Sequence, residues 1–149
     1  MRALGLDVGE ARIGLAFGDT GVRIALPAGV IERTATDADV EAVLREARSR
    51  DAGVLVVGMP YTLRGTRGPQ AESVEAFVAA LRAAVLRAAM GIDVVTVDER
   101  FSTAEAQQRI AEARGPAGRG KGRRPPKGAD DAAAAAVIVT RWLDQGRSP

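Results

Sequence analysis

Short apolar runs separated by a glycine-bearing turn open the chain. Residues 3–8 and 12–17 are two such runs, and the turn between them contains Gly9. This spacing predicts a β-hairpin. Residues 23–31 predict a third strand. Pro27 inside it implies an edge position or a β-bulge, because proline has no N–H with which to donate a hydrogen bond to a neighbouring strand.

Apolar residues then recur at helical spacing in four segments. A short apolar run rich in β-branched residues follows each of the first two segments. The helices are predicted over residues 36–50, 69–90, 102–113 and 129–143, and the strands over residues 54–57 and 92–97. Thr36 and Asp39 match the S/T-x-x-D/E signature of a helix start. The element order predicts one α/β domain over residues 1–149: a mixed five-stranded sheet, three antiparallel strands followed by parallel ones, with helices on both faces.

The composition narrows the chemistry more than it narrows the fold. At 46% hydrophobic and 27% charged the chain is typical of a globular domain, and it contains no cysteine and no histidine. Thiolate sites, imidazole metal ligands and serine–histidine triads are therefore excluded, which leaves carboxylates, amines, hydroxyls and hard cations such as Mg²⁺ or Mn²⁺. No apolar run approaches the roughly 18 residues of a membrane span, so the sequence predicts a cytoplasmic protein without membrane partners.

Acidic residues stand where strands end. Asp7 lies inside the first predicted strand, where an unpaired buried carboxylate is costly, so it needs a cation, a nest of backbone N–H groups or a metal ion as its partner. Glu99 follows the last predicted strand, and Asp130 and Asp131 open the last helix. Ligands bind beyond the carboxyl ends of strands in open α/β sheets. Carboxylates converging there would repel one another without a divalent cation, and two such ions about 4 Å apart can support phosphodiester cleavage.

A basic segment precedes the last helix. Residues 114–128 combine five glycines and three prolines with six basic residues and no acidic one: Arg114, Arg119, Lys121, Arg123, Arg124 and Lys127. This composition predicts a flexible loop, and the local charge favours a polyanionic partner.

Structural explanations compete with each of these assignments. Asp130 and Asp131 could serve only as helix-start residues, because acids there complement the helix dipole. Glu99 could be a surface acid, and the basic segment a solvated loop. The residues alone leave these alternatives open.

Several motifs together resemble one protein family. They are Asp7-Val8-Gly9 with Arg12-Ile13-Gly14, Gly58-Met59-Pro60, Asp98-Glu99-Arg100 with Ser102-Thr103, and Lys127 with Asp131 before an alanine-rich helix that ends in Asp144-Gln145-Gly146. In this order, over nearly the whole chain, they resemble the YqgF/RuvX family of small bacterial proteins. That family has a ribonuclease H-like fold and is described as Holliday junction resolvases and as nucleases maturing the 5′ end of pre-16S rRNA. Two departures are Thr62, where the family usually carries asparagine, and the composition of the basic loop.

The resemblance implies catalytic and metal-binding roles for Asp7, Glu99 and Asp131, with Asp130 as a competitor, and Mg²⁺ or Mn²⁺ as the cofactor. The expected partner is pre-rRNA, branched DNA or both. Nucleic-acid binding is expected from Arg12 and Arg100 and from the loop residues Arg119, Lys121, Arg123, Arg124 and Lys127. Cleaving a two-fold symmetric junction by paired cuts would favour a homodimer.

Two other functions fit parts of the sequence. The first is a non-catalytic RNA-binding ribosome-assembly factor that retains the acids as remnants of the fold. The second is an actin-like or sugar-kinase-type nucleotide-binding domain, since those proteins also begin with an Asp-x-Gly hairpin. They normally close two such domains around ATP, whereas 149 residues provide one.

Overall fold

The computed structural model describes residues 1–60, 68–99 and 129–145. The strands are β1 (Arg2–Val8), β2 (Arg12–Asp19), β3 (Ala25–Glu32), β4 (Val54–Met59) and β5 (Asp93–Asp98), and the helices are α1 (Thr36–Ser49), α2 (Pro69–Arg87) and α4 (Ala129–Gln145). The helix predicted over residues 102–113 and the basic loop over residues 114–128 lie outside the described residues.

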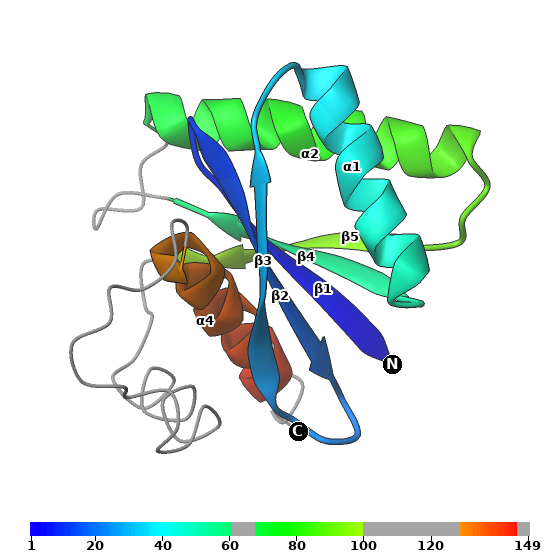
Figure 1. The fold of residues 1–149 in the computed structure, drawn as a ribbon, viewed down its shortest axis with the longest axis vertical. Helices are drawn as coiled ribbons and strands as arrows, with labels where there is room; N and C mark the ends of the chain where they lie inside the picture. Colours follow the sequence, from blue (N-terminus) through cyan, green and yellow to red (C-terminus); the bar gives the residue numbers. More distant parts are fainter. Residues whose placement is uncertain (61–67, 100–128, 146–149) are drawn as a thin grey trace.

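The five strands form one mixed sheet in the order β3-β2-β1-β4-β5. β1 pairs antiparallel with β2, and β2 with β3, whereas β4 is parallel to both β1 and β5. Figure 1 shows α1 and α2 on one face of this sheet and α4 on the other. The predicted α/β class, with a mixed sheet between helices, is confirmed.

The face under α1 and α2 carries the larger apolar core. Alternate strand residues point toward it, as the two-residue period of a strand requires. They include Leu4 and Leu6 of β1 and Leu55 and Val57 of β4, all fully buried. Phe77 and Leu81 are among the α2 residues that complete this core. Aliphatic side chains therefore fill most of this core.

The opposite face is built from small residues, so that α4 lies very close to the sheet. An added Cβ at Gly5 of β1 would lie 3.1 Å from the carbonyl oxygen of Ala135, and one at Gly18 of β2 would lie 2.6 Å from Cγ1 of Val139. Ala135 and Val139 of α4 are themselves fully buried. Glycine here serves close approach of helix to strand.

Two local predictions have different outcomes. The expectation at Pro27 is confirmed twice, because β3 is an edge strand and its pairing with β2 shifts register between Leu15 and Ala16. The capping motif is wrong in its mechanism. α1 does begin at Thr36, but its N-cap is Ala35, which makes no side-chain capping bond, while the Asp39 carboxylate accepts the backbone N–H of Thr34 instead.

Within the described ranges, no helix combines the length and the apolar character needed to cross a bilayer.

Candidate acidic site at the carboxyl edge of the sheet

Two acids from distant parts of the chain meet where the parallel strands end. Leu6 of β1 pairs with Val57 of β4, and Met59 of β4 pairs with Asp98 of β5, so Asp7 and Glu99 follow these pairs at one edge. The Glu99 carboxylate lies directly against the backbone of Gly58, in space that any Cβ at that position would occupy. Gly58 therefore lets Glu99 fold back over β4.

The carboxyl groups of Asp7 and Glu99 share a hydrogen bond. Burial raises the pKa of Asp7 above its ordinary value, and the charge of Asp131 raises it further. Burial and then the charge of Asp7 raise the pKa of Glu99 to about 7. Loss of hydration disfavours a charged carboxylate, and a neighbouring like charge adds to this. Between about pH 4.5 and 7 Glu99 therefore keeps a proton that an isolated glutamic acid would have lost.

Asp131 is brought to this pair by the approach of α4 to β2. Its backbone carbonyl lies directly over Gly14, leaving no room for a Cβ, and Gly14 pairs with Asp7 across the β1–β2 hairpin. Asp130, the adjacent acid, is exposed. The neighbouring acids of α4 thus have different surroundings, and only Asp131 is among the charges that act on Asp7.

Arg12 lies beside the acids and binds two carboxylates. Its Nε is 3.1 Å from Oε1 of Glu32, and its Nη1 is 3.8 Å from Oδ2 of Asp131. About a quarter of the Arg12 side chain is exposed, so it borders the site from the solvent side. The other expected nucleic-acid ligands lie outside the described residues: Arg100, Arg119, Lys121, Arg123, Arg124 and Lys127.

The sequence analysis gave no role at this site to Glu32, and it named Gly14 and Gly58 only within the family motifs. Glu32 reaches Arg12 because the two residues are paired across β2 and β3. The glycines matter because α4 and Glu99 lie on them. Strand register and helix docking were the missing information, although the glycine in each short apolar strand was a usable signal of close approach.

The chemistry of the donors fits a hard divalent cation. Carboxylate oxygens are the ligands of Mg²⁺ and Mn²⁺, and a bound cation would relieve the repulsion between the charges of Asp7 and Glu99. No three acidic, histidine or cysteine side chains in the described part of the chain are gathered closely enough to form a ready-made metal site.

The raised pKa of Glu99 predicts a pH-dependent stability of the metal-free protein. In the folded protein the Glu99 carboxyl keeps a proton that it releases above about pH 4.5 in the unfolded chain. The free energy of unfolding therefore falls as the pH rises from about 4.5 through about 7. Glu99→Gln removes this loss. We expect the variant to match the wild type at pH 4.5 and to exceed it at pH 8 by roughly 2 kcal/mol, allowing for solvent screening. Thermal unfolding in EDTA at both pH values measures this, and an equal difference at both would contradict it.

A family model and curated relatives match this chain over nearly its whole length. The family model described as "RuvX: Holliday junction resolvase" matches residues 1–145. A protein of Anaeromyxobacter sp. (strain Fw109-5) is 40% identical over 144 residues, covering 97% of each chain. One of Thermus thermophilus is 41% identical over 146 residues, covering 98% of this chain and 99% of its own. Both are named "Putative pre-16S rRNA nuclease".

Solved structures share the fold at low sequence identity. T. thermophilus RuvC in complex with a Holliday junction substrate superposes with a TM-score of 0.63 at 19% identity, covering 98% of this chain and 95% of RuvC. The yeast mitochondrial Holliday junction resolvase Ydc2 gives 0.61 at 13% identity, covering 95% and 77%. The predicted ribonuclease H-like fold is confirmed, and with the match over residues 1–145 the chain belongs to the RuvX family.

Proposed function

We propose that this protein is a metal-dependent nuclease that hydrolyses phosphodiester bonds in structured nucleic acid. Its leading substrate is the 5′ end of pre-16S rRNA, as in the names of its relatives, and its second is the Holliday junction, as in the description of its family. The observation that carries the proposal is the contact between Asp7 and Glu99, with Asp131 beside them, at the carboxyl edge of the sheet. As a nuclease of an rRNA precursor, the protein would act in the cytoplasm.

Asp7, Glu99 and Asp131 would hold Mg²⁺ or Mn²⁺. Such ions lower the pKa of water and stabilise the leaving oxygen of a phosphodiester. Asp7 and Glu99 contribute by converging before substrate arrives, and they would hold a cation in their ionised forms. Asp130 is not assigned to this group, because it is exposed while Asp131 faces Arg12.

Basic residues would hold the substrate. Arg12 borders the acids and is positioned to exchange its contact with Asp131 for a phosphate oxygen. Arg100 and the basic residues of the 114–128 segment supply phosphate contacts whose strength falls with salt. With one Trp, one Tyr and three Phe in the chain, recognition rests on backbone and shape rather than on base stacking.

Cleavage of labelled substrates tests the proposal. A pre-16S rRNA leader and a four-way DNA junction are incubated with Mg²⁺, with Mn²⁺ or with EDTA. We expect cleavage in either metal and none in EDTA, with the rRNA leader cut faster. No cleavage of either substrate, with binding intact in all three conditions, would contradict the nuclease and favour the ribosome-assembly factor.

The junction reading has a further requirement. Paired cuts across a two-fold symmetric junction are made most simply by two active sites, so junction resolution predicts a homodimer on the DNA. Sedimentation of the protein with an uncleavable junction in EDTA measures this. A monomer on the junction would count against paired cleavage and leave rRNA processing as the activity.

A further inference from the structure

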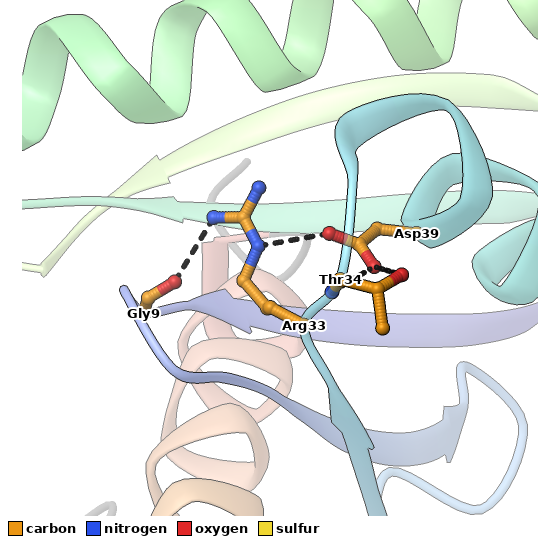
Figure 2. Close-up of polar contacts among 4 residues, drawn as sticks. All are labelled: Gly9, Arg33, Thr34 and Asp39. Carbon is orange, nitrogen blue, oxygen red and sulfur yellow. Dashed lines mark hydrogen bonds and ion pairs between the residues drawn. The ribbon is translucent and has the colours of Figure 1, made fainter.

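The turn between β1 and β2 begins two residues after Asp7, and Arg33 binds it at two points. The backbone N–H of Arg33 donates to the carbonyl of Ala11 at 2.9 Å, and its guanidinium Nη1 donates to the carbonyl of Gly9 at 3.0 Å. The turn itself contributes one bond, from the N–H of Gly9 to the carbonyl of Arg12 at 2.9 Å. Arg33 therefore connects the segment between β3 and α1 to the turn beyond Asp7 (Figure 2).

The Arg33 guanidinium is itself held by two other elements. Its Nε donates to Oδ2 of Asp39 at 3.1 Å, and its Cζ lies 5.2 Å from the ring centroid of Phe77 in α2. Asp39 is only 2% exposed, and its other oxygen accepts the backbone N–H of Thr34 at 3.0 Å. Burial alone would raise the pKa of Asp39, but the Thr34 N–H and the Arg33 guanidinium bring it below its ordinary value. An ionised Asp39 thus orients Arg33 (Figure 2).

We propose that Arg33 is a positioning residue for the acidic site: it holds the β1–β2 turn, and through the turn it sets where β1 presents Asp7 to Glu99. The proposal rests on the nuclease function above and adds a residue that touches neither substrate nor metal. A planar guanidinium with separate N–H groups suits this role, because it bonds Asp39 and Gly9 at once. Metal ligands must be held to within about 0.5 Å by such supporting contacts.

The chain contains a matched control for Arg33. Arg50, at the other end of α1, makes the same three kinds of contact. Its Nε donates to the carboxylate of Glu46 at 3.2 Å, and its Nη2 donates to the carbonyl of Ala28 at 3.5 Å. Its Cζ lies 5.9 Å from the ring centroid of Phe17. Arg50 differs from Arg33 in its position. It lies near the beginning of β1, where its carbonyl accepts a hydrogen bond from the guanidinium of Arg2. An effect of Arg33 on the acids should therefore not appear at Arg50.

The test compares Arg33→Met combined with Asp39→Asn against Arg50→Met combined with Glu46→Gln. The paired changes leave no uncompensated charge, and the side-chain amide introduced at position 39 can still accept the N–H of Thr34. Mn²⁺ alone is titrated into each metal-free protein by calorimetry, and RNA cleavage is measured at saturating Mn²⁺. We expect the first pair to raise the Kd for Mn²⁺ by about tenfold or more and to lower kcat, with KM for RNA within about twofold. The control pair should change each by less than about twofold.

Arg33→Lys covers the case in which the first pair does not fold. A single ammonium group keeps the charge beside Asp39 but cannot reproduce both fixed N–H directions, so we expect a weakened affinity for Mn²⁺ at a Tm close to that of the wild type. Wild-type Mn²⁺ affinity in a folded Arg33 variant, or an equal loss in the Arg50 control, would overturn the proposal. A wild type that binds Mn²⁺ but cuts neither substrate would contradict the nuclease function and leave the comparison of affinities valid.

Discussion

Replacing Asp7 by Asn should lower the rate of metal-dependent cleavage by a factor of about 10³ or more while the protein stays folded. The amide keeps the size of the carboxylate but removes the charge that a divalent cation needs at the centre of the site. It also removes the repulsion between the charge of Asp7 and those of Glu99 and Asp131, so the metal-free variant should unfold at the same temperature as the wild type or higher. Rates at saturating Mn²⁺ and thermal unfolding in EDTA measure the two effects.

Two matched controls separate the role of Asp7 from a general effect of lost charge. Asp130→Asn removes an exposed acid of α4 next to Asp131, and Asp93→Asn removes an exposed acid at the beginning of β5. Both variants should cut at nearly the wild-type rate. A loss of rate in Asp130→Asn equal to that in Asp7→Asn would show that Asp130, and not Asp131, is the third ligand. An Asp7→Asn protein that binds nucleic acid and cleaves at the wild-type rate would exclude the proposed mechanism.

Gly14→Ala should produce the largest loss of stability among conservative changes at the site. Its new methyl group would collide with the backbone carbonyl of Asp131, which cannot rotate away as a side chain can. We expect a loss of about 3 kcal/mol, at the upper end of overpacking effects. Because α4 must move away from β2, Asp131 moves with it, and a displacement of about 1 Å should cost roughly 10²-fold in rate.

Gly53→Ala is the comparison for this substitution. Its methyl group would contact the flexible side chain of Met1, whose Cγ lies 3.2 Å away. The nearest backbone atom is farther, the carbonyl oxygen of Arg2 at 3.9 Å. We expect a change of less than about 1 kcal/mol. Urea unfolding of both variants measures the stabilities. If Gly14→Ala were as stable and as active as Gly53→Ala, α4 would not need glycine on β2 to place Asp131.

Within residues 1–60, 68–99 and 129–145, the order and type of the elements could be predicted from the sequence alone. Apolar residues at periods of two and 3.6 dictate strands and helices locally, and the pattern of a hairpin followed by alternating helices and strands leaves few ways to form one sheet. The absence of cysteine and histidine also excluded thiolate and imidazole sites, and Asp7 inside an apolar strand indicated a carboxylate that needs a partner.

Only the tertiary structure decided how the site is assembled. Glu32 reaches Arg12 through strand register. Asp131, which the family resemblance already favoured over Asp130, comes close to Asp7 because its carbonyl lies on Gly14, the partner of Asp7 across the hairpin. The capping motif at Thr36 was misread for the same reason, since the Asp39 carboxylate is engaged by Thr34 and Arg33. Local periodicity carries no information about which distant side chains meet, because contacts across elements depend on register and on how closely a helix can approach a strand.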